Sequence, residues 1–178
     1  MTGLNEEKCE LLEFGCILDD FNNPLPLEQL PRFHCYFAQE FYTGEPQALS
    51  MHPVIFKRIA DREPGYTYVS PTRFGNMFKL FLLKNGYKEE RQLVYINVAG
   101  KNVDGDVRFL QMKTDIDKHV RVRGRLIDPA ILYADVKNDE ALPGLSECKK
   151  RLGIEEKVSH NALDDAIDVI KLLRGKLL

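Results

Sequence analysis

The chain has 178 residues, of which 44% are apolar and 29% are charged, and its formal net charge is −2. A chain of this length and composition is typical of one globular domain with a substantial core, so we treat residues 1–178 as a single domain. The near-neutral charge balance excludes the overall basic character of a sequence-reading DNA-binding domain. Nucleic acid held through metal ions stays open, because the ions themselves would bring the positive charge.

The sequence contains four cysteines, namely Cys9, Cys16, Cys35 and Cys148. They form no CxxC pair and do not cluster with histidines, which argues against a zinc site and favours buried thiols in a reducing compartment. The first residues show no basic segment followed by an apolar run, and no apolar stretch reaches the ~18 residues that a membrane span requires. We therefore expect a cytoplasmic protein with no membrane partner.

The first half of the chain predicts two strands followed by helices. In chain order we expect strands over residues 11–18 and 32–37 joined as a hairpin, a loop over 44–53, and helices over 54–60 and 71–83. Pro53 starts the first helix, and Ser70 with Pro71 supplies the N-cap and first turn of the second. Apolar residues of the second helix recur at i, i+3, i+4, i+7 and i+8, which predicts one buried face.

The second half predicts strands that alternate with helices. In chain order we expect a strand over residues 92–99, a helix over 106–113, a strand over 120–126, a short helix or turn over 128–133, and helices over 144–152 and 159–173. The nearly continuous apolar run of the first strand favours a parallel strand covered on both faces. The Val-Arg-Val-Arg alternation of the second predicts a half-exposed strand. Together the elements predict a mixed α/β domain.

The last helix combines a clear apolar stripe with acidic residues. The stripe consists of Ala162, Leu163, Ala166, Val169, Ile170 and Leu173. At ~100° per residue, Asp164 and Asp168 lie opposite the stripe and should face water, whereas Asp165 lies at its border. Electrostatic preference for the N-terminal half of a helix explains Asp164 and Asp168. For Asp165 it leaves two interpretations open, a complement to the helix dipole or a ligand that lines a cleft.

His160 lies just ahead of this helix. Its ordinary pKa near ~6.5 suits it to accept a proton from water at neutral pH. A lone histidine is more often structural, so its spacing to the acids does not decide between the two roles.

Residues 159–166, Ser-His-Asn-Ala-Leu-Asp-Asp-Ala, closely resemble the third motif of the DEDDh exonucleases. This superfamily includes oligoribonuclease, RNase T and the proofreading subunit of bacterial DNA polymerase III. Residues 98–110 resemble its second motif, in which a strand ends and an aspartate starts the next helix. The resemblance extends over essentially the whole chain, and it implies an RNase H-like mixed sheet flanked by helices.

The second motif is one residue shorter here than in the family. We assign its aspartate to Asp106, because Phe109 and Leu110 follow at the expected distance. Asp104 is the alternative.

The first motif of the family is Asp-x-Glu followed by Met-Thr-Gly-Leu or Thr-Thr-Gly-Leu, and this chain starts at Met1 with Met-Thr-Gly-Leu. We therefore hypothesise that the natural protein begins upstream of Met1, so that the first, central strand and its two carboxylates are absent from this chain. Strands beside a missing central strand would leave backbone groups unpaired, at ~1–3 kcal/mol for each buried group.

The resemblance implies a 3′–5′ exonuclease that releases nucleoside monophosphates by a two-metal mechanism with Mg²⁺ or Mn²⁺. Asp106 and Asp165 would be the remaining metal ligands, and His160 would be the general base. Without the two upstream carboxylates, we expect the 178-residue chain to be inactive or nearly so.

The partner implied by the resemblance is the 3′ end of single-stranded DNA or RNA. Thr2, Gly3 and Leu4 match positions that contact the terminal nucleotide, with Leu4 against the base, and Asn102 helps to position the strand. His52 either lines the entrance or is structural. Many relatives form homodimers, and this possibility stays open. The alternative function is a non-catalytic nucleic-acid- or partner-binding protein derived from the same fold.

Overall fold

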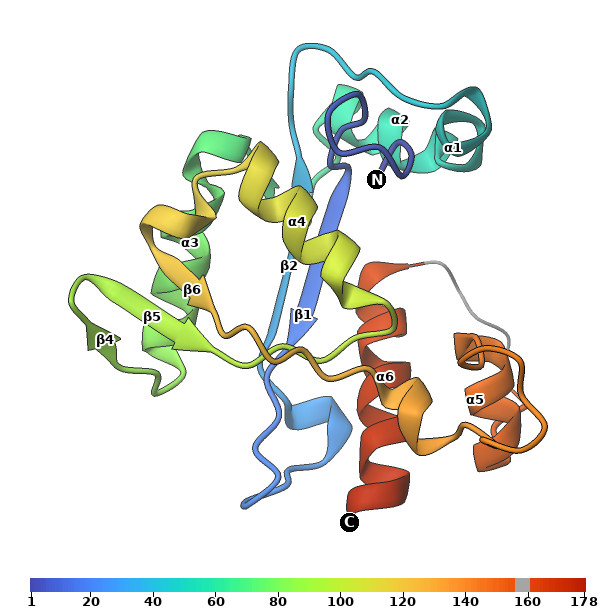
Figure 1. Cartoon of the computed structure of the whole chain (residues 1–178). Coiled ribbons are helices and arrows are strands. Elements are labelled where there is room, and N and C mark those ends of the chain that lie inside the picture. Colours follow the sequence, from blue (N-terminus) through green and yellow to red (C-terminus); the bar gives the residue numbers. More distant parts are fainter. Residues whose placement is uncertain (156–160) are drawn as a thin grey trace.

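The computed structural model of the chain describes residues 1–155 and 161–178, which form a mixed α/β fold (Figure 1). The strands are β1 (Glu13–Ile17), β2 (Arg32–Phe37), β3 (Tyr68–Val69), β4 (Glu89–Glu90), β5 (Leu93–Ile96) and β6 (Val120–Val122). The helices are α1 (Pro46–Met51), α2 (Pro53–Asp61), α3 (Pro71–Lys84), α4 (Val103–Lys113), α5 (Leu145–Leu152) and α6 (Ala162–Leu177). Short 3₁₀ turns are η1 (Leu27–Gln29), η2 (Ile116–Lys118) and η3 (Pro129–Leu132).

The described strands form two three-stranded sheets, β1–β2–β3 and β4–β5–β6. In the first, β1 and β2 are antiparallel and β3 joins β2 in parallel, which confirms the predicted pairing of residues 11–18 with 32–37. In the second, β4 and β5 form an antiparallel hairpin, and β6 lies parallel to β5. The parallel arrangement predicted for the strand within 92–99 is therefore confirmed.

Both sheets share one hydrophobic core beneath α3. Phe74, Phe78 and Leu82 recur at helical spacing on α3 and are at most 3% exposed. They belong to the same cluster as Phe37 of β2 and Val94 of β5. The single apolar face predicted for this helix is thus what joins the two sheets.

Several predicted boundaries or environments are wrong. The strand predicted over 120–126 is limited to Val120–Val122, and the helix predicted over 106–113 already begins at Val103. The predicted loop over 44–53 contains α1, which Pro46 starts because its fixed φ suits the first helical turn. The strand predicted over 92–99 is limited to Leu93–Ile96, and its burial alternates instead of covering both faces. The last helix begins at Ala162 and not at 159 within the described residues, because Asn161 is its N-cap.

Asp168 corrects the predicted orientation of α6. It is 5% exposed instead of facing water, and it forms an ion pair with Lys149 of α5. The physical reason is that α6 packs against β1 on one side and α5 on the other (Figure 1). A helix covered on two sides has a second buried face, which the apolar stripe alone does not reveal. Asp164 is exposed as predicted.

Other predictions agree with the fold. Gly153 ends α5 in the left-handed region with φ 83°. The cysteines are free thiols, and Cys9, Cys35 and Cys148 are buried. Among the described residues, no helix combines the length and the apolar character that crossing a membrane would need.

Candidate active site

Asp106 lies in the first turn of α4, whose start is fixed by Asn102 and Asp128. Asn102 adopts a left-handed conformation with φ 53°, which asparagine tolerates better than most residues. Its N–H donates to the Asp128 carboxylate over 2.9 Å, and the N–H of Ala130 donates to the same carboxylate, also over 2.9 Å. Burial opposes ionisation of Asp128, but these hydrogen bonds outweigh it and lower the pKa. Asn102 therefore positions α4 through its backbone.

Asp106 and Asp104 differ in their surroundings. The side chain of Asp104 is 61% exposed and forms an ion pair with Arg108, one turn later in the same helix. Asp106 is also at the surface as a residue, yet neighbouring protein atoms desolvate its carboxyl group and raise its pKa. The amine of Met1 opposes that shift through its positive charge. Asp106 is thus the acid that faces other parts of the chain.

The negative charges of Asp106 and Glu13 both act on the Met1 amine. Burial lowers the pKa of this amine, while the negative charges of Asp106 and then Glu13 act in the opposite direction. Any residue joined upstream of Met1 would be attached at this nitrogen.

Glu13 of β1 contacts both His34 of β2 and the first turn of α6. One of its carboxylate oxygens lies 2.7 Å from Nε2 of His34, and the other accepts a hydrogen bond from the N–H of Ala162 over 3.3 Å. The Glu13 side chain is 9% exposed. Its sequence signal is an acid inside an apolar strand, which is uncommon unless the acid has partners. The sequence prediction of the site missed it.

Gly15 allows α6 to approach β1 closely. A Cβ atom at this position would lie 2.8 Å from backbone atoms of Ala162 and Leu163. Asn161 caps the helix by accepting hydrogen bonds from the N–H groups of Leu163 and Asp164 over 3.0 and 3.4 Å. The first turn of α6 is therefore held in place both by the strand and by its own cap.

Asp165 lies one helical turn after the cap, and its N–H donates to the carbonyl of Asn161 over 2.9 Å. The residue is half-buried, in keeping with the predicted border position. Glu13 is thus the acid that the described contacts link directly to the start of α6. His160 and the rest of 156–160 lie outside the described residues.

An open pocket of about 440 Å³ adjoins the start of α6. It is lined by Glu13, Tyr36, Met51, His52, Val54, Ile55, Arg58 and Asn161. Arg58 donates a hydrogen bond to the hydroxyl of Tyr36 over 3.0 Å and stacks 4.7 Å from the centre of the Tyr66 ring. His52 therefore lines an open pocket beside Asn161; whether it serves as an entrance or is structural stays open.

Thr2 is fully buried within the N-terminal loop. Its hydroxyl donates to the carbonyl of Thr43 over 2.5 Å and accepts from the N–H of Glu10 over 2.6 Å. These bonds give its side chain a structural role in this arrangement, so a contact between Thr2 and a nucleotide stays a prediction.

Leu4 lines a second open pocket, and Gly3 directly precedes it in the chain. Gly3 has φ 153°, and a Cβ there would clash with Cys9 and Glu45. Leu4 is 82% exposed, and its N–H donates to the Glu45 carboxylate over 3.2 Å. Its side chain lines the pocket together with Met112 of α4, so it is available for an apolar contact with a base.

Asp106 and Asp165 are the two metal ligands that the sequence predicts. The oxygen donors of Asp106 and Asp165 have the chemistry that Mg²⁺ and Mn²⁺ prefer. Within the described part of the chain, however, no group of three or more His, Cys, Asp or Glu side chains could hold a metal ion.

No protein-family model and no curated protein matches the chain. The DEDDh resemblance therefore depends on the sequence motifs alone.

Proposed function

We propose that this chain belongs to a 3′–5′ exonuclease that removes nucleoside monophosphates from the 3′ end of single-stranded nucleic acid. The observation that supports this most is the acid Glu13 on β1, whose carboxylate accepts a hydrogen bond from the first turn of α6, the helix that carries Asp165. The proposed chemistry also requires Asp106 of α4 to lie near this turn, which is part of the proposal.

The two separate sheets are compatible with an RNase H-like sheet that lacks its middle strand. Such a fold has one mixed sheet with its first strand at the centre. Here β1–β2–β3 and β4–β5–β6 pack on the same core without being hydrogen-bonded to each other in the described residues. In the proposed fold, a strand that carries Asp-x-Glu and leads into Met1 would join them.

The protein residues have separate tasks in the proposed mechanism. Bound Mg²⁺ or Mn²⁺ would supply charge neutralisation at the phosphate and a more acidic water. Asp106 and Asp165 would hold the ions, and His160 would take the proton of the attacking water. Leu4 would pack against the terminal base, and Asn102 would hold α4 in place through Asp128.

A nuclease assay tests this proposal. We expect the 178-residue chain to leave a 5′-labelled oligonucleotide intact in Mg²⁺ or Mn²⁺, and a chain extended by its upstream coding sequence to shorten it from the 3′ end. In the extended chain, His160→Ala should lower the rate about 10²–10⁴-fold, the typical contribution of a general base. Asp106→Asn should also abolish activity, because it removes a ligand.

A matched control makes the assay specific. Asp104→Asn removes an exposed carboxylate from the same helix and should leave the rate unchanged. An active 178-residue chain, or an upstream sequence without Asp-x-Glu, would contradict our account of the site.

A non-catalytic binding protein derived from this fold is the second candidate. The observation that favours it is that no group of three or more His, Cys, Asp or Glu side chains in the described part of the chain could hold a metal ion. A melting temperature that rises with added Mn²⁺ would support a metal site, because a ligand that binds only the folded state stabilises it. An unchanged melting temperature would favour the scaffold.

A further inference from the structure

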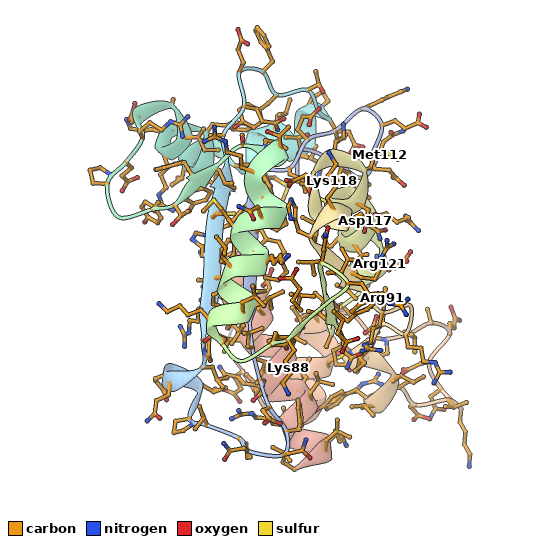
Figure 2. All side chains as sticks on the ribbon, turned by 90° about the vertical axis from the view of Figure 1, so that its left-hand side faces the viewer. Lys88, Arg91, Met112, Asp117, Lys118 and Arg121 are labelled. Atoms are coloured by element: carbon orange, nitrogen blue, oxygen red, sulfur yellow. The ribbon has the colours of Figure 1, made fainter. Side chains whose placement is uncertain are left out.

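The second sheet and the turn beside it carry a row of exposed cations, Lys88, Arg91, Lys118 and Arg121, which we call the basic row. Figure 2 shows these side chains following one another along one side of the molecule, from Lys118 to Lys88. All four are exposed. Among the described residues, none of them forms an ion pair with a carboxylate.

The register of β5 and β6 explains why cations gather on this face. Val94 pairs with Val120, and both are buried in the core. Their neighbours Tyr95 and Arg121 also pair, and because side chains alternate along a strand they point to the opposite face. Arg123 lies two residues further on, with its guanidinium 5.5 Å from the centre of the Tyr95 ring. The outer face therefore combines cations with a half-exposed aromatic ring.

Few acids neutralise this face. Glu89 forms an ion pair with Lys79 of α3, whose Nζ lies 3.0 Å from the Glu89 carboxylate. Asp117 lies within the row in Figure 2, between Lys118 and Arg121, and accepts a hydrogen bond from Gln111 over 3.3 Å. Glu90 directly precedes Arg91 in the chain. Since the whole chain has a net charge of −2, the cations here are a local concentration and not an average property.

The basic row leads to the pocket of Leu4. Met112 is 55% exposed, lines that pocket and stands at the Lys118 end of the row in Figure 2. We propose that the basic row binds the phosphate backbone of single-stranded nucleic acid, with Tyr95 offering a stacking surface for a base. Cations along the backbone and an aromatic ring for the bases are the usual elements of such binding.

This inference rests on the proposed function only for the direction of the strand, whose 3′ end would lie at Leu4. The binding itself needs no hydrolysis. We therefore measure binding in EDTA, by fluorescence anisotropy of labelled oligothymidylate and oligouridylate of about 16 nucleotides. Oligonucleotides of about 4 nucleotides with the same bases serve as the short comparison. Activity of the extended chain is assayed separately, so binding without hydrolysis would refute the proposed function and keep this inference.

The test variant is Lys118→Gln/Arg121→Gln, and its control is Lys137→Gln/Lys150→Gln, which removes the same charge from exposed residues elsewhere. For single strands the slope of log affinity against log salt changes by about 0.7 per phosphate contact. The test variant should therefore reduce the slope by about 1.4 and weaken binding of the long oligonucleotide about 25-fold at 0.1 M salt. The control and the short oligonucleotide should show little change.

Three results would overturn the inference. The first is equal weakening by the control variant, which would mean that total charge alone governs binding. The second is no binding of either oligonucleotide by the unmodified chain. The third is binding to vesicles of phosphatidylcholine and phosphatidylserine in place of the oligonucleotides, which would identify a lipid-binding face. Circular dichroism of both variants establishes that they are folded.

Discussion

The ion pair between Lys149 and Asp168 gives the sharpest prediction about stability. It joins α5 to α6, the helix that carries Asp165, and the two side chains are 2% and 7% exposed. The perturbation is removal of one partner at a time, by Asp168→Asn or Lys149→Met. Each leaves a charge that is shielded from water and has lost its main partner.

Breaking a buried pair in this way costs about 3–5 kcal/mol. The two variants should not be equal, because Lys171 Nζ lies 3.9 Å from the other oxygen of Asp168. Lys149→Met leaves Asp168 beside this second cation, so we expect a value near about 3 kcal/mol. Asp168→Asn leaves Lys149 without a nearby acid, so we expect a value near about 5 kcal/mol. Against a typical total of about 5–15 kcal/mol, either change is large.

Urea unfolding followed by circular dichroism measures these differences, and thermal midpoints should fall by about 6–20 °C in parallel. The double variant Lys149→Met/Asp168→Leu should recover most of the loss, because a well-packed apolar pair often matches a buried ion pair. Asp61→Asn, which breaks the exposed pair with Lys57, is the control and should leave the midpoint unchanged. Single variants as stable as the unmodified chain would refute the reasoning.

Three further changes act on the candidate site. Gly15→Ala should cost about 1–3 kcal/mol in the same unfolding assay, since its Cβ would overlap backbone at Ala162; an unchanged midpoint would mean that α6 moves away freely. Asn161→Ala should cost about 0.5–2 kcal/mol through loss of the cap, and Asn161→Ser should restore most of it. Asp106→Asn should stabilise the metal-free chain slightly at pH 7. The raised pKa of Asp106 means that the folded state binds more protons than the unfolded state, so stability falls as pH rises above the ordinary value of 3.8. The difference between variant and parent should vanish below that pH.

Much of the fold could be predicted from local sequence patterns. Strand β2 and helices α2, α3 and α5 lie close to their predicted ranges, because proline starts, apolar periodicity and a terminal glycine are local signals. The two-residue strands β3 and β4 were not predicted, since a pairing this short depends on the neighbouring strand and not on its own residues.

The candidate site was less predictable for the same reason. Asp106 and Asp165 were identified through motifs, but the burial of Asp168 depends on a helix some twenty residues earlier in the chain. Glu13 was missed because its partners, His34 and Ala162, come from two distant segments. Sequence periodicity describes one element at a time, and these contacts arise only when elements pack together.

The charges around the Met1 amine show what the site requires. Burial raises the pKa of Asp106 and lowers the pKa of the amine. Desolvation therefore disfavours the charged form of each group relative to water. Each also favours ionisation of the other, and Glu13 adds a second negative charge beside the amine. A positive charge near Asp106 therefore favours its ionised form. In the 178-residue chain the Met1 amine supplies that charge. In the proposed exonuclease, divalent ions would supply it with more charge, and would stabilise the ionised form of Asp106 that the protein alone disfavours.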